Sequence, residues 1–304
     1  MNTGTEAVET GIKLARKWGY IKKKILKNKE IIISCSNNFH SRTAMAISMS
    51  TNPVICKDFG PYMPCVGPIC PYTGRIIEYN SVDDLEATLK IHGSLVAGFL
   101  VEPIQGDAGI IVPNDGYLKK CYDLCKKYNV LVIVDKIQTG VEHTGKMLCQ
   151  EYDGIRADII LLEKALSGGF YPVSAVLADQ EIMLCIQPGE YSSTYGGNPL
   201  GSAVVIAALE VIKEENLVER AAVLGEKFRE ALCEIKSPLI SQSRGLIAKP
   251  THVNTIHLAP PLNITEKELM ESINIIKEAL EDIVNMEAED IPGYLEDLNL
   301  HNYS

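Results

Sequence analysis

The chain has 304 residues, of which 46% are hydrophobic and 22% are charged, a balance typical of globular proteins that excludes general disorder. The 29 lysines and arginines against 39 aspartates and glutamates give a formal net charge of −10, which disfavours non-specific binding to nucleic acid or anionic lipid. No apolar run reaches the ~18–20 residues that cross a bilayer, so no integral membrane segment is predicted. The nine cysteines are scattered and form no C-x-x-C pair, which favours free thiols in a reducing compartment over disulfides or a zinc site.

The first part of the chain combines one helix with irregular segments. Apolar residues recur at helical spacing from Thr5 to about Tyr20, and the β-branched run at Ile31–Cys35 is typical of a buried strand. Five prolines between Asn52 and Pro71 interrupt any period and predict a long loop.

Beyond this loop, short and fully apolar strands alternate with helices. The expected strands are Val96–Val101, Val130–Val134, Ile159–Leu162 and Val173–Leu177. The expected helices are Asp115–Tyr128, Pro199–Glu215, Leu217–Ile235 and a last one that opens at the capping box Thr265-x-x-Glu268 and continues to about Ile283. Because strands that are apolar on both faces need cover on both faces, this order predicts an α/β fold with a mostly parallel sheet between helices.

The polar residues that end these strands are the candidates for chemistry, because ligands of such sheets bind at the carboxyl ends of the strands. They are Glu102, Asp135 with Gln138, and Lys164. A half-buried carboxylate at Asp135 needs a cation, a metal or a protonated ring nitrogen as its partner, unless it only caps the following turn. A lysine at a buried strand end forms a Schiff base once its pKa is depressed, unless its side chain extends to the surface.

Two turns and one aromatic residue complete the pattern. The turns Thr3–Thr5 and Ser193–Thr194 are rich in hydroxyl groups and glycine, and their backbone N–H groups suit a phosphate, although ordinary helix caps look the same. Phe39 follows a predicted strand and serves either as core packing or as a plate against an aromatic ring. A lysine, an acid for a ring nitrogen, phosphate-binding turns and an aromatic plate together indicate a pyridoxal phosphate site.

Several longer stretches resemble the class III, fold-type-I pyridoxal-phosphate-dependent aminotransferases, and most closely the members that act on ornithine. They are MNTGTEAVETGIKLARKWGY, NNFHSRT, FLVEPIQGDAG, VIVDKIQTG, ILLEKALSGG, QPGEYSSTYGGNPLG and LIAKPTH with LAPPLNI. The resemblance runs from Met1 to about Ile283. It implies the fold-type-I α/β fold and transfer of the δ-amino group of ornithine to 2-oxoglutarate, giving glutamate semialdehyde and glutamate in arginine catabolism and proline synthesis.

The resemblance further implies that four side chains surround the ring of the cofactor, pyridoxal 5'-phosphate. Lys164 binds the cofactor covalently and carries the proton between substrate and cofactor. Asp135 pairs with the ring nitrogen and keeps it protonated, Gln138 approaches the ring hydroxyl oxygen, and Phe39 stacks on the ring.

The same resemblance assigns the cofactor phosphate to the two turns. Gly4 and Thr5 hold the phosphate of their own subunit. Thr194 reaches the phosphate of the neighbouring subunit, so a homodimer is implied.

The expected partners are small amino acids and oxo acids, with neither nucleic acid nor membrane. Substrate carboxylates are assigned to Arg42 and to the pair Asp107 and His257, where the family has glutamate and arginine. Because histidine is shorter and mostly uncharged at neutral pH, it lacks the bidentate grip of arginine on a second carboxylate.

Two more residues near the predicted site differ from the family. Lys136 follows Asp135 where the family has glutamate, and we expect its ammonium group to compete for the Asp135 carboxylate. Glu163 precedes Lys164 where the family has glycine, so a carboxylate stands at a tight strand end. This carboxylate either stays there unpaired or forms an ion pair with a nearby lysine.

The family also has a sizeable segment before the position of Met1 and a few dozen residues between Gly245 and Leu246 that have no counterpart here. We therefore expect a large cofactor-binding domain at 1–198, a helical connection at 199–235, an incomplete small C-terminal α/β domain at 236–284 and an acidic, mobile tail at 285–304.

Alternatives to an ornithine-specific enzyme stay open. One is a pyridoxal-phosphate-binding derivative with little or no turnover. Another is a transaminase for a different ω-amino acid, such as acetylornithine or 4-aminobutyrate, although LIAKPTH and QPGEYSSTYGGNPLG favour ornithine. No targeting segment is recognisable, and the family occurs in the cytoplasm and the mitochondrial matrix, so either location is expected.

Overall fold

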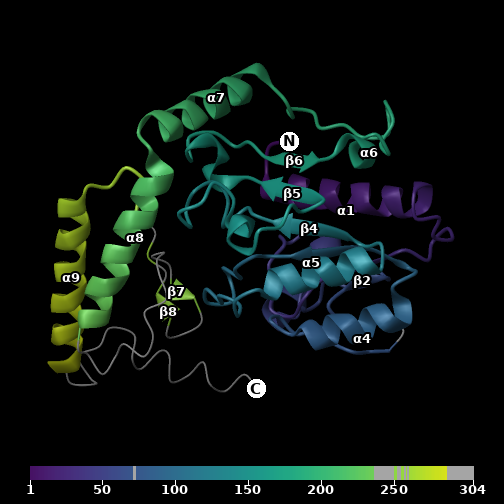
Figure 1. The fold of residues 1–304 in the computed structure, drawn as a ribbon, viewed down its shortest axis with the longest axis horizontal. Helices are drawn as coiled ribbons and strands as arrows, with labels where there is room; N and C mark the ends of the chain where they lie inside the picture. The colour runs from purple at the N-terminus through teal and green to yellow at the C-terminus, as the bar shows by residue number, and fades with distance from the viewer. Residues whose placement is uncertain (71–72, 236–249, 252–254, 257, 259, 286–304) are drawn as a thin grey trace.

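A six-stranded sheet lies between helices (Figure 1) in the computed structural model, which describes residues 1–70, 73–235, 250–251, 255–256, 258 and 260–285. Its strand order is β2-β1-β3-β4-β5-β6; each pair from β2 to β5 is parallel, and β6 runs antiparallel to β5 at the edge. The strands are β1 Ile31–Ile33, β2 Val66–Gly67, β3 Val96–Val101, β4 Leu131–Asp135, β5 Ile159–Leu162 and β6 Ala175–Ala178. The predicted α/β class with a mostly parallel sheet is confirmed.

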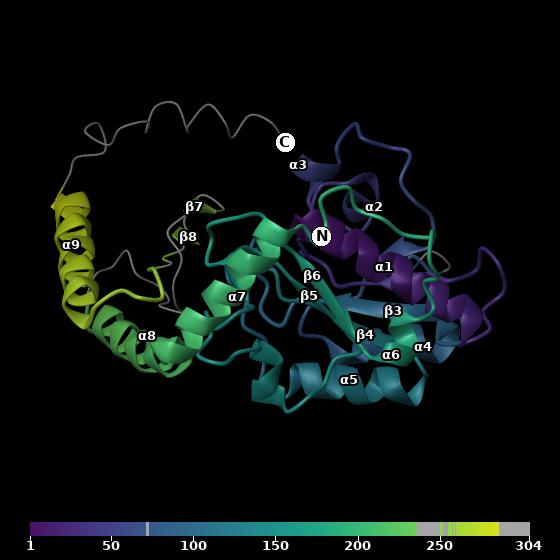
Figure 2. The same ribbon diagram turned by 90° about the horizontal axis from the view of Figure 1, so that it is seen from above.

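Alternate residues of the central strands enter two separate hydrophobic cores. Ile32 belongs to the core under α1 (Gly4–Ile21), whereas Phe99 belongs to the core under α4 (Val82–His92) and α5 (Tyr117–Lys127). Figure 2 shows α1 on one side of the sheet and α5 on the other. Since all six residues of β3 are buried, the strand is stable only with both faces covered.

The helix α1 lies close to the sheet at two of its glycines, Gly11 and Gly19. A Cβ on Gly11 would lie 2.7 Å from Cδ2 of Leu161, and a Cβ on Gly19 would lie 2.9 Å from the Cβ of Ala97. This contact aligns α1 along the strands and fixes where its first turn lies.

The helix α4 was not predicted from the sequence. Its buried residues are only Leu85, Thr88 and Leu89, which give too narrow an apolar stripe to show a clear helical period. The available signal was its N-cap, since the Ser81 side chain accepts a hydrogen bond from the backbone N–H of Asp84.

The segment predicted as a long loop is also more structured than expected. It contains the short helix α3 (Pro53–Cys56) and the edge strand β2, and the short helix α2 (Ala44–Ile47) precedes it. Two- and four-residue elements are too short to produce a period in the sequence.

The three long helices predicted after residue 198 agree with α7, α8 and α9 to within two residues, whereas the short helix α6 was not predicted. After the sheet, α7 leads into α8, and α8 packs against α9 around Phe228, Leu232 and Ile273. The remaining elements are α6 Gln180–Met183, α7 Pro199–Glu214, α8 Leu217–Glu234, α9 Glu266–Asn285, the 3-10 helices η1 Cys149–Asp153 and η2 Lys164–Ser167, and the antiparallel pair β7 Pro250–Thr251 and β8 Thr255–Ile256. In the described part of the chain, no helix combines the length and apolarity needed to cross a membrane.

Lys136 follows β4 and is fully buried. Its Nζ has no hydrogen-bond partner in the described part of the chain, so the prediction that it competes for the Asp135 carboxylate is wrong. The physical reason is that neighbouring residues of an extended chain point to opposite faces, and the charges that act on Lys136 are those of η1, including Glu151 and Asp153. Burial lowers the pKa of Lys136 to about 8, and the nearby acidic groups offset this only in part.

Replacing Lys136 by methionine should raise the free energy of unfolding at pH 7 by about 1–3 kcal/mol, because an unpaired buried ammonium gives way to an apolar chain of similar length. The gain should shrink as the pH rises from about 8 towards 10.5. In that window the unfolded wild-type chain binds more protons than the folded one, so the wild type gains stability while the variant does not. Urea unfolding at pH 7 and pH 10 measures both effects.

The matched control is Lys120→Met, which removes an exposed lysine of α5 and should change the unfolding free energy by less than about 0.5 kcal/mol. A Lys136→Met variant that is less stable than the wild type at pH 7 would contradict the unpaired state of this amine.

Candidate functional site

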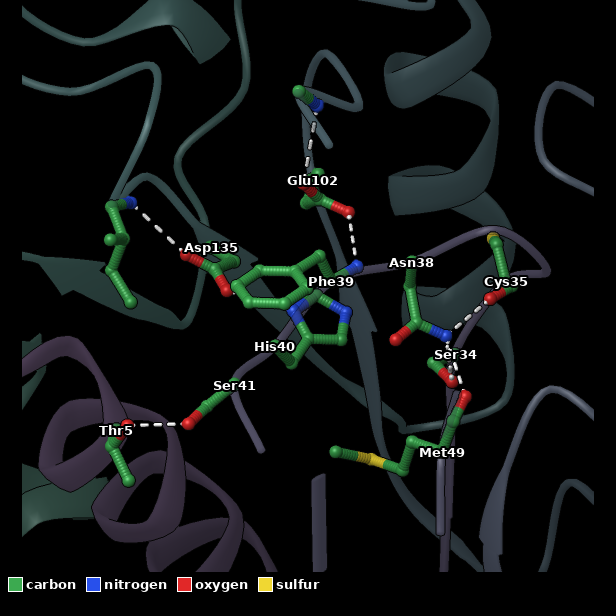
Figure 3. A network of polar contacts seen from close by, with 12 residues as sticks. Thr5, Ser34, Cys35, Asn38, Phe39, His40, Ser41, Met49, Glu102 and Asp135 are labelled. Carbon is green, nitrogen blue, oxygen red and sulfur yellow. Dashed lines mark hydrogen bonds and ion pairs between the residues drawn. The ribbon is translucent and has the colours of Figure 1, made fainter. Parts of the chain in front are cut away.

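The polar residues predicted from the strand ends gather at one edge of the sheet, beside the first turn of α1. Asp135 comes from β4, Glu102 follows β3, and the loop that contains Phe39 follows β1 (Figure 3). Thr5 of α1 contacts the same loop through Ser41 (Figure 3). The carboxyl ends of neighbouring parallel strands therefore form one site, as doubly wound sheets generally do.

The centre of this site is a buried ion pair. Asp135 is 5% exposed, and its Oδ2 accepts a hydrogen bond of 2.8 Å from Nδ1 of the buried His40. Its Oδ1 accepts a hydrogen bond of 3.0 Å from the backbone N–H of Ile137. Burial lowers the pKa of His40, but the hydrogen bond to Asp135 and the charges of Asp135 and Glu102 outweigh burial, so its pKa is raised. Asp135 thus has a buried histidine partner whose protonated form it favours, and it does more than cap a turn.

Glu102 holds the loop that carries the aromatic plate. Its Oε2 accepts a hydrogen bond of 3.1 Å from the backbone N–H of Phe39, and its Oε1 accepts one of 3.4 Å from that of Gly106. Burial raises the pKa of Glu102 to about 7, with the charge of His40 acting against it. The half-buried Phe39 ring is therefore fixed relative to the ion pair by a carboxylate, and not by core packing alone.

Lys164 is exposed, so the prediction of a lysine at a buried strand end is wrong in this respect. It begins η2, two residues beyond the end of β5, and its Nζ donates a hydrogen bond to Oε1 of Gln138. Its φ of +40° lies in the left-handed region, which costs a residue other than glycine roughly 1–2 kcal/mol. Backbone strain of this kind concentrates at functional sites.

Glu163 forms no ion pair with Lys164 or with any other lysine of the described residues. Instead, its Oε2 lies 3.4 Å from the position of a Cβ built on Gly4. That Cβ would lie 2.9 Å from Cδ1 of Ile137, so a side chain at position 4 would force its neighbours to move. The first turn of α1 is thus approached closely by both the β4 and the β5 loops.

The second predicted phosphate turn also lies beside α1. Ser193 Oγ donates a hydrogen bond of 2.8 Å to Oε1 of Glu6 and accepts one of 3.2 Å from Nδ2 of Asn2. Thr194 is exposed. Its contact with the phosphate of a neighbouring subunit stays a prediction.

The residues predicted to bind substrate carboxylates are only partly brought together. Arg42 is exposed, and its guanidinium lies over the Phe39 ring, with Cζ 5.7 Å from the ring centroid. Asp107 is half-buried in the loop after β3. His257 lies outside the described residues, so its pairing with Asp107 stays a prediction.

Two residues of the site were missed by the sequence reasoning. His40 and Ser41 both lie in the loop after β1, beside Phe39. The available signal for His40 was indirect: a buried carboxylate needs a positive partner, and a histidine follows the predicted plate. No sequence signal identified Ser41, because its role depends on the placement of α1.

The side chains present suit pyridoxal phosphate. The buried carboxylate of Asp135 matches a protonated ring nitrogen, and the exposed amine of Lys164 beside Gln138 suits covalent attachment. Backbone N–H groups of the first turn of α1, where Gly4 has no side chain, suit a phosphate. The Glu163 carboxylate beside Gly4 is the one feature that opposes a phosphate there.

Comparison with known proteins identifies the family of the chain. Residues 1–245 match the family model described as aminotransferase class-III. The ornithine aminotransferase of Schizosaccharomyces pombe is 54% identical, covering 93% of this chain and 72% of that protein. The mitochondrial ornithine aminotransferase of Drosophila melanogaster is 47% identical, covering 92% of this chain and 69% of that protein.

Solved structures give the same result. The ornithine aminotransferase from Toxoplasma gondii superposes with a TM-score of 0.88 at 38% identity, covering 94% of this chain and 72% of that one. The acetylornithine aminotransferase from Elizabethkingia anophelis superposes with a TM-score of 0.81 at 44% identity, covering 93% of this chain and 74% of that one. With a matching family model over most of its length and these relatives in sequence and structure, the chain belongs to the class III aminotransferases.

Proposed function

We propose that the chain is a pyridoxal-phosphate-dependent aminotransferase that transfers the δ-amino group of ornithine to 2-oxoglutarate. The observation that carries the proposal is the buried ion pair of Asp135 and His40 at the same sheet edge as Lys164 and Gln138. The relatives named ornithine aminotransferase, at 47–54% identity, support ornithine as the donor.

Each of these residues has a task that follows from its position. The cofactor supplies a ring that withdraws electrons from the carbon bearing the amino group of the substrate. Asp135, which accepts a hydrogen bond from His40, would pair with a protonated ring nitrogen. Lys164 Nζ would hold the cofactor and carry the substrate proton, and its hydrogen bond to Gln138 keeps the amine at the site. Phe39, whose backbone N–H donates to Glu102, would pack against the ring.

The similarity to an acetylornithine aminotransferase supports a second candidate substrate. Acetylornithine and ornithine share the amine at the reacting end and differ at the far end, where one amine carries an acetyl group. Arg42, which we propose as a carboxylate ligand, serves both, so it does not decide between them.

We also propose a homodimer organised around α7. This helix exposes large apolar side chains that a second subunit would cover, namely Leu200, Ile206 and Val211. In such a dimer the exposed Thr194 would reach the phosphate bound by the partner subunit.

We further propose that the chain divides into a large domain at 1–198, a helical connection at 199–235 and a small domain beyond. We also propose a location in the cytoplasm or in mitochondria, because the relatives from rice and fly are named as mitochondrial.

Spectroscopy of the purified chain tests the central proposal. With pyridoxal phosphate it should develop the absorbance of a lysine-bound cofactor, which ornithine should convert to the absorbance of the amino form and 2-oxoglutarate should restore. Lys164→Ala should lower turnover on the order of 10³-fold or more, because the covalent attachment and the moving proton share this one amine.

The control is Lys120→Ala, which removes a distant exposed lysine and should leave the spectrum unchanged. No cofactor band at all would sink the proposal. A band that ornithine leaves unchanged indicates a cofactor-binding derivative, and a response to acetylornithine in place of ornithine assigns the second substrate.

The role of His40 predicts a particular pH dependence. Because the pKa of His40 is raised, its stabilising charge is fully present below its ordinary value of 6.5 and is lost as the pH rises through the raised value. His40→Asn should therefore cost about 3 kcal/mol of unfolding free energy at pH 6 and clearly less at pH 9. Urea unfolding at both pH values measures the difference.

The histidine His143 provides the matched control. Burial lowers its pKa, so the cost of His143→Asn should grow with pH and not shrink. A cost for His40→Asn that grows with pH, as expected for His143→Asn, would contradict a raised pKa of His40 beside Asp135.

A further inference from the structure

The carboxylate of Glu163 lies at the start of α1, where the proposed function places the cofactor phosphate. Thr3 is the N-cap of this helix and Gly4 its first residue. Glu163 Oε2 lies 3.4 Å from the position of a Cβ on Gly4, and the side chain is half-buried. A carboxylate group therefore lies beside the first residue of the helix.

No other group in the described residues neutralises Glu163. Its side chain takes part in no hydrogen bond or ion pair there, and the adjacent Lys164 donates to Gln138. A second acid of the first turn, Glu6, is already engaged: it accepts hydrogen bonds from the backbone N–H groups of Asn2 and Thr3, and from Ser193. Glu163 is thus the acid whose charge is still available to act on an incoming anion.

A helix start attracts one anion well but not two in contact. The free N–H groups and the helix dipole favour a negative group, whether it is a carboxylate or a phosphate. Two negative charges a few ångströms apart repel each other, and a partly buried site screens this repulsion less than water does. A phosphate at this turn must therefore either displace the Glu163 carboxylate or bind against its charge.

We propose that Glu163 is an affinity-determining residue, whose carboxylate lies beside the first residue of α1 and, by its charge, weakens the binding of phosphate-bearing ligands in this chain. This inference rests on the proposed function for the identity of the ligand. It concerns the phosphate end only, so the vitamer without phosphate, pyridoxal, should not sense the Glu163 charge.

Titrations with pyridoxal phosphate and with pyridoxal test this difference. Glu163→Gln keeps the size of the side chain and removes its charge, and it should lower the Kd for pyridoxal phosphate about 10-fold, as expected for one relieved contact between charges. The Kd for pyridoxal should change by less than about twofold. Glu163→Ala removes both charge and bulk and should give at least the same gain. Cofactor absorbance in the absence of substrate is the readout.

Inorganic phosphate gives a second readout that does not require cofactor chemistry. Phosphate should raise the Tm of Glu163→Gln more than that of the wild type, because ligand binding stabilises the folded state. The matched control is Glu230→Gln, which makes the same charge change at an exposed position of α8 and should alter neither the Kd nor the phosphate effect.

The outcomes separate this inference from the proposed function. If the wild type and the variants bind neither pyridoxal phosphate nor pyridoxal, the proposed function fails, and the phosphate effect on Tm alone decides the role of Glu163. If the cofactor binds but Glu163→Gln and Glu163→Ala leave the ratio of the two Kd values unchanged, the inference is overturned. An equal gain for both ligands also overturns it, because that gain would come from bulk and not from charge.

Discussion

The site depends on a negative charge that the sheet buries at the end of β4. The Asp135 carboxylate is 5% exposed, and such a charge is stable only with a close positive partner. His40 provides that partner from the loop after β1, so this loop must lie across the carboxyl end of β4. The hydrogen bond that stabilises the acid therefore also fixes where the loop runs.

The consequences of this placement extend across the sheet. Asn38 anchors the loop by donating hydrogen bonds to the carbonyl oxygens of Cys35 and Met49, at 2.7 and 2.6 Å. Glu102 anchors it from β3 through the N–H of Phe39, and Ser41 joins it to Thr5 at the start of α1 (Figure 3). The elements β1, β3, β4 and α1 thus meet in one polar network.

The sequence was informative where burial alone determines the structure. The apolar runs located β3 and β5 to the residue, because strands buried on both faces leave no polar positions inside them. Their polar ends then gave Glu102, Asp135 and Lys164 without any knowledge of the family. Contacts between distant segments left no such pattern. The pairing of His40 with Asp135 spans 95 residues, and it depends on which strands are neighbours in the sheet.

No local sequence pattern predicts the exposure of Lys164 either. The apolar run suggested that burial continued to the lysine, but the chain leaves the sheet at Leu162 and turns through the left-handed conformation at Lys164. An exposed amine is solvated and free to reach a ligand, whereas a lysine inside the sheet would need a compensating charge. The strain at this residue therefore serves to turn the amine out of the core and towards Gln138.

Lys136 and Glu163 show that closeness in sequence does not decide which charge affects a site. Lys136 is covalently next to Asp135, but the alternation of an extended chain directs its ammonium away from the site towards η1, where it acts on stability. Glu163 lies 28 residues from Asp135 in the sequence, yet β4 and β5 are neighbours in the sheet, and its carboxylate meets the first turn of α1. Lys136 therefore lowers the stability of the fold, whereas Glu163 is proposed to weaken phosphate binding. The two residues differ in the face of the sheet on which their side chains lie. Side chains from different strands meet on a common face, whereas residues adjacent in sequence point to opposite faces.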